Sequence, residues 1–236
     1  MPKRKARTVR PRRFAKRWPP ARRTPSFPPP AERIGAIIAG LKARFPDARC
    51  SLDQSNALEL LAATILSAQC TDARVNIVTK TLFARYKTAE DYADANPAEL
   101  AEIIKSTGFF NNKTKSLIGM GKALAERHGG QVPRTMEELT KVPGAGRKTA
   151  NVVLGNAYGI NAGVVVDTHV GRISKRLRLT RHTDPVKIEQ DLMKLVPQAE
   201  WTLFPHLMIQ HGREICEARK PRCEICPINE LCPSRL

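Results

Sequence analysis

Long apolar segments, internal repeats and an export signal are all missing from this sequence of 236 residues. No apolar run reaches the roughly 18 residues that a membrane-spanning helix needs, so we expect no transmembrane segment. No heptad array, repeat or convincing alternation of apolar and polar residues occurs either, and we predict an all-α fold. A cytoplasmic protein is the simplest expectation, and its six cysteines are then not expected to form disulfides.

Acidic residues are absent from the first 30 positions, which contain 11 of the 40 Lys and Arg residues and eight of the 18 prolines. Such a segment cannot bury apolar surface or hold a helix, so residues 1–30 are predicted to be a disordered basic arm. The whole chain carries a formal net charge of +18. A polyanion is the expected partner, and nucleic acid is the commonest one. A solvated tail without a specific role is an equally good interpretation of the arm.

The most informative stretch runs from Leu139 to Leu154 and reads LTKVPGAGRKTANVVL. Just before it, Thr135 and Glu138 have the spacing of a capping box and predict the start of a short helix. Two glycines, Gly144 and Gly146, permit a tight turn, and a second helix is predicted from about Arg147.

Lys148 lies on the first turn of that second helix and projects away from its apolar stripe. A glycine turn at a helix N-terminus gathers unpaired N–H donors and the positive end of the helix dipole, which suits a phosphate. For the glycines taken alone, an ordinary helix-turn-helix connection is the better explanation.

Three further segments carry chemistry. The heptapeptide Leu66–Asp72, reading LSAQCTD, places Gln69 at a junction between two predicted helices. Phe109 and Phe110 lie side by side in a polar loop, where apolar residues are unusual. The short run Val164–Val166 leads into Asp167-Thr168-His169, where the aspartate is read most simply as a helix cap.

Four cysteines near the carboxyl terminus have the spacing C-x6-C-x2-C-x5-C: Cys216, Cys223, Cys226 and Cys232. Four thiolates at such spacing indicate a metal site, which could hold zinc or an iron–sulfur cluster. Zinc sites typically have two short Cys-x-x-Cys pairs, whereas this segment has one. Physical reasoning alone leaves the two metals about evenly matched.

Together these motifs resemble those of the endonuclease III family. Residues 139–154 resemble the helix-hairpin-helix of DNA base-excision glycosylases. Residues 66–72 are similar to the family's Leu-Ser-x-Gln-x-Thr-Asp segment, residues 166–169 to its Val-Asp-Thr-His, and the cysteine spacing to its [4Fe-4S] loop. The resemblance extends from Ala31 onward. It implies a two-domain helix-hairpin-helix glycosylase fold: a six-helix barrel of residues 50–160, and an iron–sulfur domain formed by residues 31–49 and 161–236.

The resemblance also assigns roles to single residues. It makes Lys148 the nucleophile and Asp167 the catalytic carboxylate, and it makes the four cysteines ligands of a [4Fe-4S] cluster. Gln69 would fill the gap left by a flipped base. Phe109 would be an apolar wedge in the base stack, at a position where family members often carry leucine. The other expected DNA contacts are Gly144, Gly146, Arg147 and His169.

The implied reaction fits these side chains. Breaking the C1′–N bond of a nucleotide passes through a transition state with oxocarbenium character, which calls for a nucleophile and a carboxylate. A lysine amine that attacks C1′ displaces the base and leaves a Schiff base, from which β-elimination cleaves the strand. The expected enzyme is therefore a bifunctional DNA glycosylase and AP lyase that acts on double-stranded DNA as a monomer. By family its substrates are oxidised pyrimidines, which it must flip out of the duplex.

Three other protein classes share parts of this pattern. Adenine-mismatch glycosylases have the hairpin and the cluster but lack a lysine at the position of Lys148, and they carry an additional carboxyl-terminal domain. A non-enzymatic DNA-binding module would need the glycines but neither Lys148 nor Asp167. An electron carrier would need the cluster and not the hairpin.

Overall fold

The computed structural model describes residues 27–235, and all regular secondary structure in this part of the chain is helical. The prediction of an all-α fold is confirmed, and Val164–Val166 form an extended segment between two helices. Within residues 27–235 no helix is long and apolar enough to cross a bilayer.

The described α-helices are α1 (Pro30–Arg44), α2 (Ala57–Leu66), α3 (Asp72–Arg85), α4 (Ala89–Ala93), α5 (Pro97–Ile104), α6 (Phe110–His128), α7 (Met136–Leu139), α8 (Arg147–Tyr158), α9 (Thr168–Arg176), α10 (Pro185–Leu195) and α11 (Leu203–Glu214). Short 3₁₀ helices are η1 (Lys105–Thr107), η2 (Gln198–Glu200), η3 (Cys223–Ile225) and η4 (Asn229–Leu231).

The predicted basic arm, residues 1–30, falls mainly on residues 1–26, which lie outside the described part of the chain. The residues that follow already contact the folded protein. Arg33 Nε donates a hydrogen bond of 2.7 Å to the carbonyl of Pro28, and its guanidinium carbon lies 5.9 Å from the centroid of the Phe27 ring. Helix α1 then begins at Pro30, where a proline at the first helical position is favourable because its missing N–H would be unpaired anyway.

Most α-helices begin at a side chain that caps the first free amides. Asn56 caps α2, Thr71 caps α3 and Asp184 caps α10, each by accepting a hydrogen bond from the first turn. Thr135 caps α7 as predicted, because its hydroxyl accepts from the amide of Glu138 at 3.3 Å. The reciprocal bond of a capping box is replaced, however: Glu138 accepts from the Thr135 hydroxyl at 2.8 Å.

Two separate hydrophobic cores stabilise the fold. The first lies among α2–α8 and contains residues such as Leu60, Leu117 and Val153. The second lies among α1, α9, α10 and α11 and includes Ile37 and Phe204. We refer to residues 50–162 as the first lobe, and to residues 34–48 together with residues 164–232 as the second lobe.

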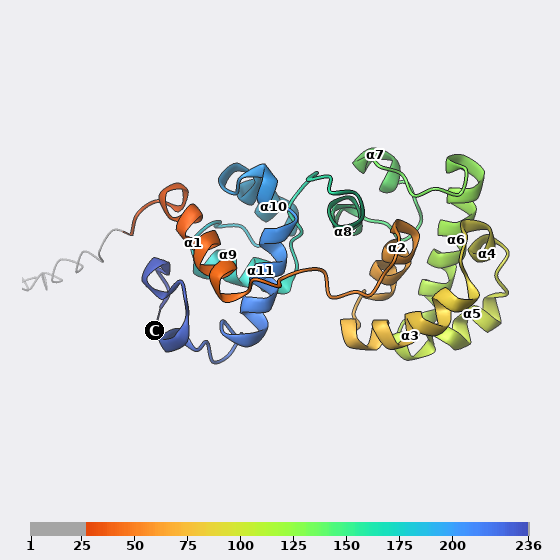
Figure 1. Ribbon diagram of the computed structural model, residues 1–236, viewed down its shortest axis with the longest axis horizontal. Helices are drawn as coiled ribbons and strands as arrows, with labels where there is room; N and C mark the ends of the chain where they lie inside the picture. The colour runs from red at the N-terminus through yellow and green to blue at the C-terminus, as the bar shows by residue number, and fades with distance from the viewer. Residues whose placement is uncertain (1–26, 236) are drawn as a thin grey trace, which may run out of the picture.

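The chain passes between the two lobes twice, after Ala48 and before Val164, so α1 joins helices that follow it by more than 100 residues. Figure 1 shows α2–α7 gathered at one end of an elongated molecule and α1, α9 and the carboxyl terminus at the other, with α8 between them. The predicted domain boundaries, 50–160 against 31–49 with 161–236, remain a proposal, which the separation of the two cores supports. A functional site that uses side chains from both lobes must therefore lie near the segments that connect them.

Candidate active site and metal centre

The turn between α7 and α8 depends on its two glycines for different reasons. Gly144 has a φ of +82°, and a Cβ added there would lie 3.0 Å from the Cβ of Ser116 and 3.1 Å from the Cδ1 of Ile65. Both conformation and packing therefore require glycine at this position. Gly146 has a φ of −75° and nothing within 4 Å of an added Cβ. Its lack of a side chain leaves the first amides of α8 open, which suits an anion at this helix end.

Lys148 and Asp167 are the two residues shared by a pair of neighbouring clefts. One cleft, of about 650 Å³, is bordered by the loop after α1, by the start of α3 and by α11; we call it the Asp72 cleft. The other, of about 820 Å³, lies between α9 and α10 and is called the α10 cleft. Lys148 is exposed on the first turn of α8 and Asp167 is half-buried. The two residues that sequence reasoning selected for chemistry are thus brought to one place, with Lys148 from the first lobe and Asp167 from the second.

Asp167 also caps a helix, as its surrounding sequence predicted. Its Oδ1 accepts a hydrogen bond of 2.8 Å from the amide of Val170, at the start of α9. The cap occupies one carboxylate oxygen, and a carboxylate has a second one. The capping interaction therefore fixes the side chain at the rim of both clefts rather than competing with a role there.

The Asp72 cleft contains an ion pair that sequence analysis did not identify. Asp72 accepts hydrogen bonds from Ser51 Oγ at 2.6 Å and from Arg213 Nη2 at 2.7 Å, which join α3, the loop before α2, and α11. Burial by itself raises the pKa of Asp72. The hydrogen bonds from Ser51 and Arg213, and the charges of Arg213 and Lys148, outweigh burial and lower that pKa. Asp72 is therefore ionised at neutral pH, and its charge acts on the amine of Lys148.

His206 of α11 lines the same cleft and was also missed. Its Nε2 lies 2.9 Å from Oδ1 of Asn156 on α8. Burial lowers the pKa of His206, although the charge of Asp72 opposes this, so the imidazole is neutral at pH 7. The cleft thus has a neutral ring held by an amide, beside an ionised carboxylate. A histidine among the apolar residues at the start of a helix gave no sequence signal for this arrangement.

Arg147, a predicted DNA contact, is held by a carboxylate of the other lobe. Its Nε and Nη2 donate to Oε2 and Oε1 of Glu189 on α10 at 2.7 and 3.1 Å. Asn151 adds a third hydrogen bond to Glu189 Oε1 at 2.8 Å. The Glu189 side chain is 5 % exposed, and its hydrogen bonds raise the pKa of Arg147. Residues on both sides of Lys148 therefore clasp α8 onto α10.

The remaining predicted DNA contacts lie outside the two clefts. Gln69 and Phe109 are exposed on the loops before α3 and α6, and Phe109 is 63 % exposed. His169 packs toward α11, where an added Cβ on Gly212 would lie 2.6 Å from its Nδ1. Burial lowers the pKa of His169, while the charge of Asp167 acts in the opposite direction. Direct contact with DNA stays a prediction for these three residues.

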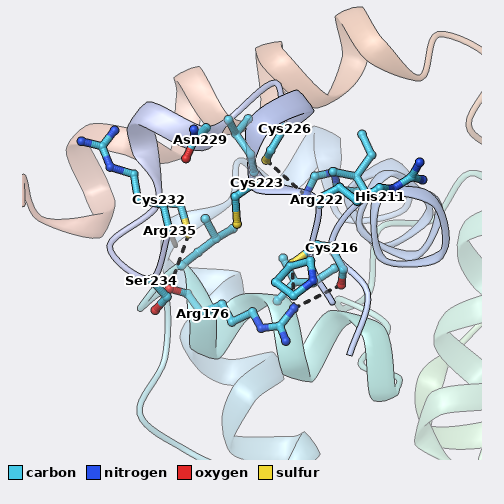
Figure 2. A pocket seen from close by; sticks show the side chains of 15 residues that line it. Arg176, His211, Cys216, Arg222, Cys223, Cys226, Asn229, Cys232, Ser234 and Arg235 are labelled. Carbon is cyan, nitrogen blue, oxygen red and sulfur yellow. Dashed lines mark hydrogen bonds between the residues drawn. The ribbon is translucent and has the colours of Figure 1, made fainter. Parts of the chain in front are cut away.

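All four predicted metal ligands line a single cavity of the second lobe, as Figure 2 shows. Arg176 reaches this cavity from α9 and donates to Cys216 Sγ at 3.1 Å and to the carbonyl of Glu217 at 2.7 Å. Such a charged donor stabilises a thiolate. Burial, together with the charges of the other three cysteines, raises the pKa of the free Cys226 thiol to about 11. Deprotonation of the cysteine thiols must therefore be coupled to binding of a cationic group.

The donor set fits an iron–sulfur cluster. In residues 27–235 no three Cys, His, Asp or Glu side chains converge closely enough to share one metal ion. A [4Fe-4S] cluster takes one thiolate at each iron, so its ligands surround the group instead of meeting at one point. The cavity also has apolar walls from residues such as Ile173, Leu177 and Ile228.

Comparison with known proteins identifies the architecture. One family model, that of HhH-GPD superfamily base excision DNA repair proteins, matches residues 62–198, and another, the iron–sulfur binding domain of endonuclease III, matches residues 216–232. The endonuclease III of Synechocystis sp. is 54% identical over 203 residues, which cover 86% of this chain and 93% of that protein. The chain belongs to the endonuclease III family.

More distant members agree with this assignment. Endonuclease III of Escherichia coli K12 is 37% identical over 196 residues, covering 83% of this chain and 92% of that protein. The structure of a trapped endonuclease III–DNA covalent intermediate has a TM-score of 0.82 and 44% identity, covering 86% of this chain and 96% of that one. A thermostable thymine-DNA glycosylase at 23% identity, with a TM-score of 0.78, shares the fold.

Membership in the endonuclease III family confirms the general predictions from sequence. The protein is a DNA glycosylase and AP lyase of base excision repair, and DNA is its partner. Its cofactor is a [4Fe-4S] cluster, and the matching iron–sulfur segment begins at Cys216 and ends at Cys232. The helix-hairpin-helix glycosylase fold with an iron–sulfur region is likewise confirmed.

Proposed function

We propose that Lys148 is the nucleophile and Asp167 the carboxylate of this enzyme. The observation that carries the proposal is that these two residues line both clefts. A nucleotide that leaves the duplex between the lobes can then present its C1′ to both side chains, with the base in one cleft and the sugar-phosphate backbone along the other.

Each step follows from the chemistry of these groups. The neutral amine of Lys148 attacks C1′, and the C1′–N bond breaks with its electrons going to the base. Asp167 accepts the proton released by the amine and stabilises the positive charge that develops on the sugar. The base takes up a proton from water as it leaves. Asp167 returns its proton to O4′ as the sugar ring opens to a protonated Schiff base. Loss of a 2′ proton then gives an enamine, whose electrons break the C3′–O bond, and the 3′ phosphate departs with the electron pair of that bond.

We propose the Asp72 cleft as the binding site for the damaged base. Its polar side chains include Asp72, Ser51, His206 and Gln210, which offer both donors and acceptors to the edge of an oxidised pyrimidine. The [4Fe-4S] cluster, when bound, cross-links four thiolates and so fixes the loop that follows α11. Exposed basic residues of that loop then face DNA: Arg219, Lys220 and Arg222.

Both proposed catalytic side chains come from one chain, which supports a monomeric enzyme; sedimentation with and without DNA tests this. An enzyme that repairs DNA must reach the chromosome. This requirement supports the expected cytoplasmic location, with association to the nucleoid if the source is bacterial. The predicted contacts Gly144, Gly146 and Arg147 lie beside Lys148, and their part in binding the phosphate backbone belongs to the same proposal.

Borohydride trapping on a duplex with a single thymine glycol tests the mechanism. Wild type is expected to give a covalent adduct, and Lys148→Gln to reduce the rate of trapping about a thousandfold or more. Lys122→Gln is the matched control, because Lys122 is an exposed lysine of α6 that lines neither cleft.

The variant Asp167→Asn distinguishes the role of Asp167 as a helix cap from its proposed role in catalysis. Asparagine is as good an N-cap as aspartate, so the melting temperature should stay close to that of wild type while base release slows by about 10² to 10⁴. Full activity in Lys148→Gln, or in Asp167→Asn, would overturn the assignment of that residue.

A further inference from the structure

Two exposed residues of the first lobe have strained backbones. Gln69 and Phe109 have φ values of +54° and +48°, a left-handed conformation that is unfavourable for residues other than glycine. Gln69 lies three residues after the end of α2, and Phe109 lies two residues after the end of η1. Strain of this kind persists only where the surrounding structure holds it, so the neighbours of these two loops are informative.

A single buried ammonium group connects the two loops. Lys113 of α6 is 5 % exposed, and its Nζ donates one hydrogen bond of 2.8 Å to the carbonyl of Leu66 and another of 2.8 Å to the carbonyl of Thr107. Leu66 is the last residue of α2 and Thr107 the last residue of η1. The amide of Lys113 also donates to the carbonyl of Phe109 at 3.1 Å. One residue therefore holds the two segments that immediately precede Gln69 and Phe109.

Burying this charge is costly. Desolvation lowers the pKa of Lys113, and its hydrogen-bond partners are two neutral carbonyls rather than a carboxylate. The negative end of the α2 dipole offsets part of the cost at Leu66. A helix end facing water needs no such group, because water satisfies its carbonyls. The buried lysine instead fixes the distance between two loops that are far apart in the sequence, since the bond from Lys113 to Leu66 spans 47 residues.

We propose that Lys113 is a positioning residue that holds the Gln69 and Phe109 loops in one register, so that both side chains enter the duplex together. The proposal rests on the proposed function and on the roles that the family resemblance implies for these two side chains, which are to fill the gap left by a flipped base and to wedge into the base stack. An inserting side chain that is displaced by about 1 Å loses much of its effect on the reaction. Lys113 acts through the two loops and does not touch the reacting atoms.

A duplex with a single tetrahydrofuran abasic analogue, and with 2-aminopurine in the opposite strand at the estranged position, reports insertion without chemistry. Binding is measured by anisotropy, and 2-aminopurine fluorescence is read at saturation, so that it refers to bound complex only. Wild type is expected to raise the fluorescence by unstacking the probe. Lys113→Met should still bind but lose most of that rise, as Gln69→Ala should, and the double variant should lose little more than either alone.

Lys122→Met is the matched control, because Lys122 is an exposed lysine of the same helix. It should give the wild-type fluorescence. Lys113→Arg, which keeps donors that can reach the two carbonyls, should restore part of the rise. Melting temperatures are measured for all variants. If Lys113→Met melts below the assay temperature, Lys113→Gln, whose amide retains one donor group, is measured in its place.

A wild-type fluorescence rise in the Lys113→Met variant at saturation would overturn the proposal. On a natural abasic site in duplex DNA, Lys113→Met should slow strand cleavage about tenfold or more. Absence of cleavage by wild type would count against the proposed function alone, since the tetrahydrofuran duplex tests insertion separately.

Discussion

The two lobes are stabilised in different ways. In the first lobe, capped helices pack around a continuous apolar core, and side chains such as Asn56, Thr71 and Thr135 define where helices begin. The final segment of the described chain, residues 216–235, most of which belongs to the second lobe, contains only the short helices η3 and η4. Arginines of α1 and α9 hold it through its backbone carbonyls: Arg33 donates to Leu231, and Arg176 donates to Glu217 and Ala218.

This difference indicates that the two lobes have different structural roles. Apolar packing makes the first lobe a rigid support for Lys148. The end of the second lobe depends on polar contacts and on a cofactor, although Ile228 anchors it, 2 % exposed and packed against Gly40 of α1. The proposed catalytic residues, Lys148 and Asp167, lie where the two lobes meet, so each lobe can be perturbed with a different expected effect.

Removing one cluster ligand should give the largest effect, and it should be confined to the second lobe. In Cys226→Ser, iron–sulfur absorbance is expected to disappear, because a structural cluster needs its full set of thiolates. Hydrogen exchange should show lost protection in α9, α11 and residues 216–235, with α2–α6 still protected. Cys70→Ser is the control, since Cys70 is a free cysteine of the first lobe. Equal loss of protection in both lobes would show that their stabilities are not separate.

The two glycines of the hairpin allow a comparison within the first lobe. Gly144→Ala should lower the free energy of unfolding by about 1–3 kcal/mol, because its φ of +82° is strained for alanine and the added Cβ meets Ile65 and Ser116. Gly146→Ala should change that free energy by less than about 0.5 kcal/mol, since nothing lies near the new methyl group. Denaturant titration measures both. If Gly146 serves the open amides of α8, its variant should weaken DNA binding at unchanged stability.

The clasp between the lobes should have an intermediate effect. Glu189→Gln removes the charge that Arg147 faces but keeps an acceptor for hydrogen bonding. The Arg147 side chain is 45% exposed and solvent screens its charge. The free energy of unfolding is therefore expected to fall by about 1–2 kcal/mol. The rate of borohydride trapping should fall as well, because Lys148 lies between Arg147 and Asn151. Glu137→Gln, which alters an exposed pair with Lys141 inside the first lobe, is the control. A trapping rate equal to wild type would show that the clasp does not position Lys148.

How far sequence could predict these features depends on how local they are. Lys148 and Asp167 lie in contiguous motifs with their helix starts, so both could be selected without a structure. The cysteine spacing indicated a metal site, but the choice of iron–sulfur cluster over zinc came from resemblance and not from physical reasoning. Thr135 was predicted correctly as a cap, whereas the hydrogen bond of Glu138 back to the backbone was not found.

The contacts that sequence reasoning missed join residues that are far apart along the chain. Asp72 meets Arg213 across 141 residues, Arg147 meets Glu189 across 42, and Lys113 meets Leu66 across 47. No local pattern encodes such pairs, because each partner alone looks like an ordinary surface charge or a helix-start residue. Arg147 illustrates the consequence: its place beside the hairpin predicted a DNA contact, while its guanidinium is bound to a carboxylate of the other lobe.

The smallest expected effect concerns the ion pair of Asp72, which connects the lobes on the other side of Lys148. The pKa of Asp72 is lower in the folded protein than its ordinary value of about 3.9, so this carboxylate contributes stability above that pH and loses it as pH falls through the lowered value. Asp72→Asn should therefore be less stable than wild type by a constant amount, below about 1 kcal/mol, between pH 6 and pH 8. The difference should shrink toward zero as the pH is lowered below about 4. Urea titrations of both proteins measure it, with Asp94→Asn as a surface control. A difference that stays constant down to pH 3 would mean that Asp72 stabilises the lobes through its shape and hydrogen bonds, independently of its charge.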